Sequence, residues 1–346
     1  MADFTTIYKA AHAEFKRGLA DETIKRRRLL RELQSRGRIT FNHDGTEMDW
    51  RVRYKEHSLT AYTDGAPVQF GRIDPYIKAV LPYRAYDMNT VVTKKEKLAT
   101  KGKSAIFKLY AQKTKELKED SRKKFNGKLW GSGANGTDIH GVESIFSGTY
   151  ASGSVTGTAN GTYAGIAQTL GANGGADGSP EYDFWTPSLY AWNSTAWAGS
   201  TIFTANAGEV LRRGIVDTMV ENNGEDRVDA IFLGKQLFID FLAYLESKNT
   251  IFTQQGGGVG SMTDSGFEDV MFDGVRLTWE YDITANRGYG LNYDKMELCV
   301  MDSEFFGGEV EDDIDSKATK MDVDFFGNLK IESPRHFFKI TAVATA

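Results

Sequence analysis

The sequence is poor in the features that mark secreted, membrane-spanning and cysteine-ligated metal proteins. A single cysteine, Cys299, excludes an internal disulfide and a cysteine-rich metal site. No stretch approaches the roughly 18 apolar residues of a membrane span, and the N-terminal residues lack the apolar run of a secretory signal. We therefore expect a protein that is made in a reducing cytoplasm and has no membrane partner.

The motifs of common enzyme and cofactor sites are also missing. The glycine-rich stretches 130–136 and 256–260 lack the lysine and hydroxyl residue of a phosphate-binding loop, and no GxSxG nucleophile motif occurs. The five histidines form neither HExxH nor a pair four residues apart, and the acidic stretch 309–317 lacks the spacing of a calcium loop. The sequence thus predicts no catalytic, cofactor-binding or metal-ligating residues, and we expect a protein that is not an enzyme.

The N-terminal residues 1–38 are predicted to form a helical arm. Apolar residues recur at three- and four-residue spacing over 4–15, and Gly37 is a helix stop signal. Such an arm either contacts an acidic neighbour or nucleic acid, or its basic side chains form a solvated helix face. The basic cluster that carries the first interpretation is Arg26, Arg27 and Arg28.

Residues 39–75 are predicted to form an extended loop built on a β-hairpin. Apolar and basic side chains alternate after a turn at 43–47, and a second break falls at 63–67. A lone strand pair is too thin to hold a core, so the hairpin needs a partner surface on its own domain or on another chain. We expect the second case, with these side chains buried between chains: Trp50, Val52, Tyr54, Leu59 and Tyr62.

Two segments carry opposite charge. Residues 94–128 are predicted to form one long helix with a narrow apolar stripe, and their 13 basic and 4 acidic residues give a net charge of +9. The stretch 304–324 has a net charge of −6. A helix with charged side chains on most sides faces solvent or a surface of opposite charge. Because the stretch 304–324 has the opposite charge, we expect its residues Asp312 and Asp313 to contact basic residues within one domain or across a subunit border.

Residues 141–302 are predicted to form an α+β domain. A glycine-rich region with dense aromatic residues is followed by two amphipathic helices around a short buried strand over 205–248, and then by strands over 272–302. Cys299 falls in the last of these strands, and we interpret it as a small core residue rather than a nucleophile.

Four segments in fixed order resemble the axial domain of tailed-phage major capsid proteins, which have the Hong Kong 97-type fold. The resemblance covers roughly residues 40–340 and is strongest over 227–302, where it depends on element order more than on exact motifs. The four segments are Gly161–Ile166 (GTYAGI), Arg227–Lys248, Phe272–Ile283 and Arg287–Asp302.

The resemblance implies an order of domains along the chain. It implies an N-terminal helical arm at 1–38, an extended loop at 39–75, a peripheral domain from 76–140 and 303–346 with a spine helix at 94–128, and an axial domain at 141–302. Some capsid proteins of this type form a covalent crosslink between a lysine of the loop and an asparagine of a neighbouring subunit. In this sequence, Lys55 and Asn328 are the candidates for these two roles. No local motif supports such a bond, and we expect neither crosslinking nor maturation cleavage.

The resemblance also implies a function. It implies a major capsid protein that self-assembles in the host cytoplasm into the icosahedral shell of a virion and encloses the phage genome. The implied partners are copies of itself in hexamers and pentamers, separate scaffolding, portal and decoration proteins, and double-stranded DNA contacted non-specifically. Two alternatives stay open, namely an encapsulin-type nanocompartment shell protein, and a soluble enzyme or surface-binding protein with a glycine-rich domain.

Overall fold

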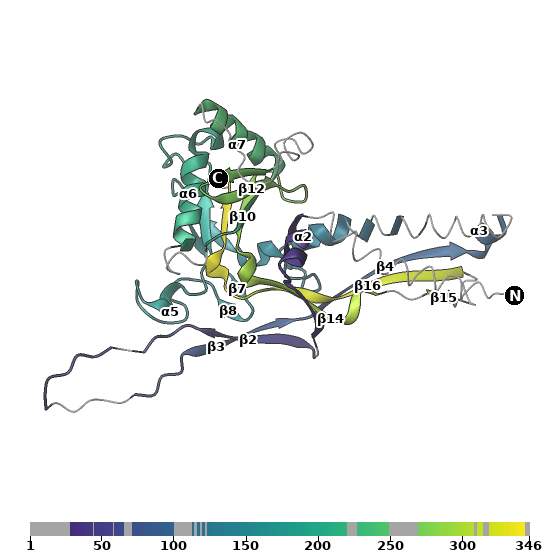
Figure 1. Ribbon diagram of the computed structural model, residues 1–346, viewed down its shortest axis with the longest axis horizontal. Helices are drawn as coiled ribbons and strands as arrows, with labels where there is room; N and C mark the ends of the chain where they lie inside the picture. The colour runs from purple at the N-terminus through teal and green to yellow at the C-terminus, as the bar shows by residue number, and fades with distance from the viewer. Residues whose placement is uncertain are drawn as a thin grey trace. The chain divides into compact units, whose positions relative to one another are not determined.

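The computed structural model divides the chain into two compact units (Figure 1). Unit 1 comprises Met1–Thr46, Pro82–Ser144 and Met296–Lys330, and unit 2 comprises Glu47–Leu81, Ile145–Lys295 and Ile331–Ala346. Both units are therefore assembled from segments that are far apart in the sequence. The structure describes residues 28–43, 45–57, 59–65, 71–99, 113, 116–117, 120–121, 123–219, 227–248, 269–307, 310–313 and 318–342.

A five-stranded sheet forms the centre of unit 1. Its strands run in the order β1-β14-β16-β15, and β4 also pairs with β16. The antiparallel ladder between β4 and β16 extends from the pair Arg84 and Gly327 to the pair Thr93 and Ala318. The strands are β1 (Ile39–His43), β4 (Arg84–Thr93), β14 (Met296–Gly307), β15 (Val310–Asp313) and β16 (Ala318–Ile331).

One face of this sheet is covered by helical segments. In β16, Met321, Val323 and Phe325 are buried, whereas the acidic residues between them are only partly buried, which is the alternation of a strand with one covered face. Residues 123–129 are helical, and the Phe125 ring meets the Phe325 ring edge-on at 4.6 Å between centroids. Helix α2 (Arg28–Ser35) contacts β14 and buries its leucines, Leu29, Leu30 and Leu33.

The predicted spine helix 94–128 is described at its two ends. Helix α3 (Lys94–Ala99) begins with a capping box, because Thr93 Oγ1 accepts a hydrogen bond from the Glu96 N–H while a Glu96 carboxylate oxygen accepts one from the Thr93 N–H. Residues 123–129 are helical as well. Between these ends the structure describes residues 113, 116–117 and 120–121, which are helical, and the remaining residues of 100–122 lie outside the described part of the chain.

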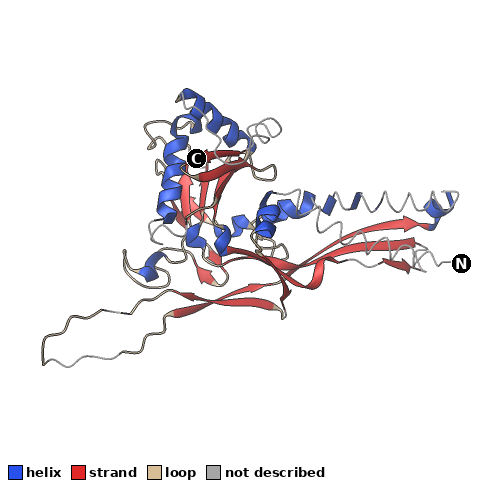
Figure 2. Ribbon diagram, in the orientation of Figure 1, coloured by secondary structure: helices blue, strands red, loops and turns tan. Residues whose placement is uncertain are grey.

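A six-stranded sheet with two helices forms the centre of unit 2 (Figure 2). Helix α6 (Phe203–Met219) contacts β9 and β17, and α7 (Lys235–Ser247) contacts β10 and β12. All four residues of β10 are buried, as expected for a strand covered on both faces. The strand order is β11 (Asp269–Phe272), β12 (Val275–Trp279), β10 (Ala230–Leu233), β13 (Arg287–Leu291), β17 (Phe338–Thr341) and β9 (Ser188–Ala191).

The glycines of β13 are needed for close packing on β17. A Cβ atom placed on Gly290 would lie 2.1 Å from the Phe338 ring, which occupies that space and is fully buried. The RGYGL segment can therefore pair closely with β17 because Gly290 has no side chain that would clash with the Phe338 ring.

A separate hairpin in unit 2 carries the extended loop. Strand β2 (Glu47–Arg53) pairs with β3 (Tyr76–Pro82), and Lys78 Nζ lies 3.2 Å from an Asp49 carboxylate oxygen across the pair. The Tyr54 N–H donates to the Pro75 carbonyl at 2.9 Å and extends the pairing by one step. The described residues between these points, 55–57, 59–65 and 71–74, form no helix or strand.

The glycine-rich region of unit 2 is organised around buried aromatic residues. Trp185 donates its indole N–H to the Tyr163 carbonyl at 3.1 Å, and the Tyr163 hydroxyl accepts a hydrogen bond from the Ile331 N–H at 2.9 Å. The short elements of this region are β5 (Gly148–Tyr150), β6 (Gly157–Ala159), β7 (Thr162–Tyr163), β8 (Ile166–Ala167) and α5 (Pro180–Asp183). Elsewhere in the chain, 3₁₀ turns occur at Val142–Ile145, Tyr293–Lys295 and Pro334–His336.

The structure differs from the sequence expectations in the pairing of strands and in the unit that holds the end of the chain. Residues 45–46 bend as expected, but β1 and β2 do not pair with each other, because β1 joins the larger sheet of unit 1 beside β14 and β2 pairs with β3 instead. The end of the chain was expected in the same domain as the spine helix, yet β17 pairs with β13 and β9 in unit 2. Among the described helices, none is long and apolar enough to cross a bilayer.

Candidate assembly surfaces

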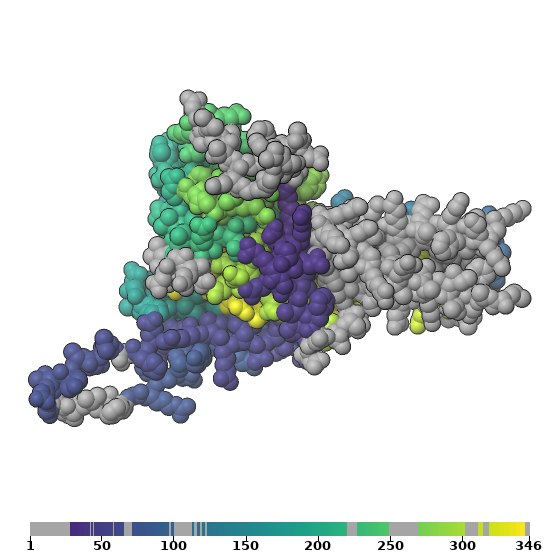
Figure 3. Space-filling view, in the orientation of Figure 1, coloured from purple at the N-terminus to yellow at the C-terminus, as the bar shows by residue number. Residues whose placement is uncertain are grey.

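The apolar residues predicted for the extended loop divide into a rooted group and an exposed group. Trp50 donates its indole N–H to the Glu332 carbonyl at 3.2 Å, and the Tyr54 ring lies 5.6 Å from the Phe184 ring, so both residues contact their own chain. Val52 is partly buried beside them in sequence. Leu59 is 103% exposed and Tyr62 is 72% exposed, and the loop lies at the surface in the space-filling view (Figure 3). Of the five predicted residues, Leu59 and Tyr62 are thus the two that are exposed.

The predicted basic cluster is only partly described. Arg26 and Arg27 lie outside the described residues, and Arg28 is the partly buried first residue of α2. Leucines cover the buried side of this helix, while Arg31 and Arg36 are exposed around it. The described basic residues that follow Arg28 in the sequence thus include two with exposed side chains.

The predicted acidic pair contacts its own chain. Asp313 forms an ion pair with Lys320 at 2.6 Å, and Asp312 accepts a short hydrogen bond from the Thr319 hydroxyl. Both contacts join β15 to β16, where Asp312 stands opposite Thr319 in the antiparallel register. In this structure the contacts of these two acids therefore link β15 to β16, rather than to the predicted basic helix 94–128.

The C-terminal end of the predicted spine helix is held by one carboxylate. Lys128 Nζ lies 2.7 and 2.8 Å from the two oxygens of Asp138, and the Tyr86 hydroxyl donates to the same carboxylate at 3.2 Å. The Tyr86 hydroxyl also accepts a hydrogen bond from the Ile139 N–H at 2.9 Å. The bond from Lys128 holds the pKa of Asp138 below its ordinary value, whereas burial raises the pKa of Tyr86 to about 12.

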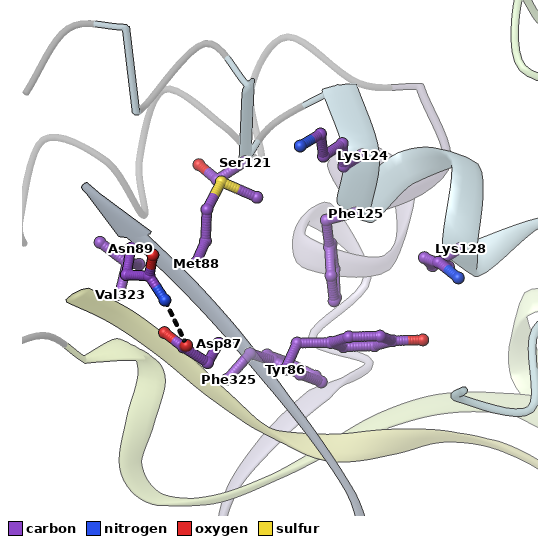
Figure 4. A pocket seen from close by; sticks show the side chains of 10 residues that line it. All are labelled: Tyr86, Asp87, Met88, Asn89, Ser121, Lys124, Phe125, Lys128, Val323 and Phe325. Atoms are coloured by element: carbon purple, nitrogen blue, oxygen red, sulfur yellow. Dashed lines mark hydrogen bonds between the residues drawn. The ribbon is translucent and has the colours of Figure 1, made fainter. Parts of the chain in front are cut away.

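A pocket of about 350 Å³ lies between this helix and the sheet (Figure 4). Its floor is apolar, its rim carries two lysines, and the Asn89 side chain donates to the Asp87 carboxylate at 2.9 Å. A hollow of this composition offers packing space to an apolar side chain but brings together no pair of catalytic groups. The lining residues are Tyr86, Asp87, Met88, Asn89, Ser121, Lys124, Phe125, Lys128, Val323 and Phe325.

Asn328, one of the two residues considered for a crosslink, is completely buried. Its amide nitrogen donates to the Pro82 carbonyl at 2.7 Å, and its side-chain oxygen accepts from the His140 N–H at 2.8 Å and from its neighbour's N–H. Burial lowers the pKa of His140, which lies beside this amide. Asn328 thus holds three backbone segments together and presents no amide at the surface.

A second polar cluster in unit 1 joins β1 to β14 and was not predicted from the sequence. One potential ligand atom from each of His43, Glu297 and Cys299 lies within 4.8 Å of the other two. Burial and the nearby Glu297 raise the pKa of the Cys299 thiol to about 12. Burial alone would raise the pKa of Glu297, but a hydrogen bond from Thr40 and the charge of Lys330 hold that pKa below its ordinary value.

Comparison with known proteins gives matches among solved structures. No protein-family model and no curated protein matches the sequence. The capsid of cyanophage A-1(L) matches with a TM-score of 0.58 and 19% identity, over 89% of this chain and 91% of that chain. The mature capsid of bacteriophage PhiM1 matches with a TM-score of 0.51 and 11% identity, over 90% and 87%. This chain has the fold of these capsid proteins.

The same fold also occurs in a different kind of shell. The SrpI encapsulin of Synechococcus elongatus PCC 7942 matches with a TM-score of 0.51 and 9% identity, over 90% of this chain and 88% of that chain. The expected Hong Kong 97-type α+β fold is thereby confirmed over nearly the whole chain. The matched proteins form the shells of particles and are not named as enzymes.

Proposed function

We propose that this protein is the major capsid protein of a tailed phage and self-assembles into the icosahedral shell that encloses the genome. The observation that carries the proposal is the match to the cyanophage capsid protein over about nine-tenths of both chains. Its place would be the virion, and its main partners would be copies of itself in hexamers and pentamers. Such rings require one surface of each chain to bind a different surface of the next.

The exposed loop residues support this proposal. Leu59 and Tyr62 are large apolar side chains on a segment that has no core of its own, and such residues in soluble proteins usually mark a contact surface when they cluster. The rooted residues Trp50 and Tyr54 hold the base of the loop on its own chain. We infer that the tip of the loop, rather than its base, binds the neighbouring subunit.

Further partners follow from the same proposal. Arg26, Arg27 and Arg28 would contact packaged DNA or an acidic neighbour through non-specific electrostatic attraction. Separate scaffolding, portal and decoration proteins would complete assembly, as a shell of one chain type has to close at defined size and connect to a tail.

The test of the proposal is electron microscopy of the purified full-length protein, expressed alone and together with a scaffolding protein. We expect closed shells, and size-exclusion chromatography should place the protein far above the mass of the monomer. A stable monomer under every condition, including co-expression with the neighbouring genes, would exclude shell assembly and favour a soluble enzyme or surface-binding protein.

The encapsulin match favours a second candidate, a nanocompartment shell protein. Both candidates predict closed particles, so the contents of the particles distinguish them. Particles isolated from infected or induced cells should contain double-stranded DNA if the first proposal is right. Particles that contain a protein cargo and no genome would support the second candidate.

A further inference from the structure

We propose that His43, Glu297 and Cys299 form a binding site for a zinc ion that joins β1 to β14. The three potential ligand atoms all lie within 4.8 Å of one another. In a tetrahedral zinc site the ligand atoms lie about 2.0–2.3 Å from the metal, and therefore about 3.3–3.8 Å from each other. Small side-chain rotations are enough to bring the three groups to that separation.

The register of the two strands explains how these residues come to one face. Strand β1 runs parallel to β14, with Thr40 opposite Cys299, but the register shifts so that His43 stands opposite Met301. With an unshifted register His43 would stand opposite the next residue, and its side chain would point to the other face of the sheet. Glu297 and Cys299 are two residues apart in β14, so their side chains point to the same face of the sheet. The shift places His43 on that face as well.

The donor set fits zinc better than the common hard cations. Nitrogen from histidine, sulfur from cysteine and oxygen from a carboxylate are all ligands of zinc, whereas calcium and magnesium prefer oxygen alone. Three protein ligands leave one position for water or for a neighbouring hydroxyl. Thr40 has a hydroxyl within the cluster, because its Oγ1 lies 2.7 Å from His43 Nε2 and 3.7 Å from Cys299 Sγ.

An outer partner orients the carboxylate. Lys330 Nζ lies 3.1 Å from one Glu297 oxygen, and both side chains are largely buried. A carboxylate has two oxygens, so one can pair with Lys330 while the other binds the ion. Hydrogen-bonded partners of this kind commonly fix the ligands of metal sites.

Cobalt(II) is the most selective probe, because a cobalt–thiolate bond gives a charge-transfer absorption band that oxygen ligands cannot give. Full-length protein is titrated with Co²⁺, and then with Zn²⁺ to displace it. We expect a thiolate band that saturates at one ion per chain and disappears on addition of Zn²⁺. Carboxylates elsewhere in unit 1, such as Asp87, Asp322 and Asp324, can bind cobalt without contributing to this signal.

Three variants test the assignment. Cys299→Ser should abolish the band, and His43→Phe, which keeps a ring beside Tyr83, should weaken Co²⁺ binding by on the order of tenfold or more. His57→Phe changes an exposed histidine of the extended loop and should leave the titration unchanged. If Cys299→Ser does not fold, the His43→Phe titration decides alone. No band in the wild-type protein, or equal affinity in His43→Phe and His57→Phe, would overturn the proposal and leave a hydrogen-bonded cluster around Thr40.

Discussion

Asp138 joins three parts of unit 1 through a single carboxylate. It accepts hydrogen bonds from Lys128 at the end of the spine helix and from Tyr86 in β4, and the Asn135 side chain approaches it at 3.4 Å. Tyr86 in turn accepts from the Ile139 N–H. Loss of the negative charge would leave Lys128 and Tyr86 with a neutral and therefore weaker common acceptor.

We expect Asp138→Asn to lower the free energy of unfolding by about 1 kcal/mol or more, because bonds to a charged acceptor are stronger than bonds to an amide. The pKa of Asp138 is depressed in the folded state, so its contribution is present above the ordinary aspartate pKa of about 3.9 and is lost as the pH falls through the lower folded-state value. Urea unfolding of wild type and variant in the same assembly state, at neutral and acidic pH, measures both effects.

The matched control is Asp177→Asn, which removes the same charge from an exposed position in the glycine-rich region. Its unfolding free energy should stay close to that of the wild type at both pH values. If the two variants behave alike at neutral pH, then Asp138 contributes no more than an ordinary surface charge.

Residue-scale contacts of this kind could be predicted least. The prediction that Cys299 is buried is confirmed. Its MELCVMD segment has the apolar composition that is typical of a buried strand. Its association with His43 and Glu297 depends on a register shift between strands that are more than 250 residues apart in the sequence, and no local pattern encodes such a shift. The burial of Asn328 could likewise not be predicted from the sequence, because its hydrogen-bond partners Pro82 and His140 come from two other segments.

At the scale of elements, the hairpin β2–β3 has a base that packs on its own unit and a loop that is exposed. Its base is tied to unit 2 by Trp50 and Tyr54, while the described part of its loop exposes Leu59 and Tyr62. Changes at the tip should therefore affect binding to other chains without changing the fold of the chain itself.

We expect the double variant Leu59→Ser, Tyr62→Ser to fold normally and to assemble poorly, because two apolar side chains no longer leave water on assembly. The control is Ile202→Ser, Tyr281→Ser, in which the tyrosine has the same 72% exposure as Tyr62 but lies outside the loop. Circular dichroism checks the fold, and light scattering follows shell formation. Equal assembly of the two double variants would contradict a binding role for the loop tip.

The pair Asp313 and Lys320 offers a second test at this scale. We expect Asp313→Lys to destabilise the β15–β16 pair, because two ammonium groups would then be diagonal neighbours in a ladder where Asp313 now forms an ion pair of 2.6 Å with Lys320, the residue opposite Glu311. The effect should be on the order of 1 kcal/mol and should shrink at high salt. Adding Lys320→Asp should restore much of the loss, as a double-mutant cycle on unfolding or assembly would show. Failure of the second change to compensate would assign Asp313 to a contact outside this strand pair.

Elements with a strong periodic pattern were predicted well. The two amphipathic helices around a short strand over 205–248 appear as α6, β10 and α7, because each carries its own apolar stripe or buried run. Strand partners were harder to foresee. β1 was expected to pair with the strand that follows it, yet it lies parallel to β14, because pairing over long distances is decided by the sheet as a whole rather than by a turn signal.

At the scale of the whole molecule, the burial of Asn328 bears on covalent stabilisation of a shell. A crosslink from Lys55 would need an accessible amide, but the Asn328 side chain is 0% exposed and all of its polar atoms are hydrogen-bonded within unit 1. We therefore expect particles boiled in detergent to give one band near 38.5 kDa on a denaturing gel. A ladder of multimers would show that another lysine and asparagine form the bond.

The position of β17 has a consequence for how the chain is made. This strand lies between β13 and β9 in the six-stranded sheet, yet it follows all five other strands in the sequence. During translation the other strands leave the ribosome first, and β9 has no place in the sheet until β17 emerges. A nascent or prematurely terminated chain thus keeps two strand edges open and cannot present a finished unit 2. In the proposed shell, the order of synthesis delays the moment at which a subunit becomes competent to join others.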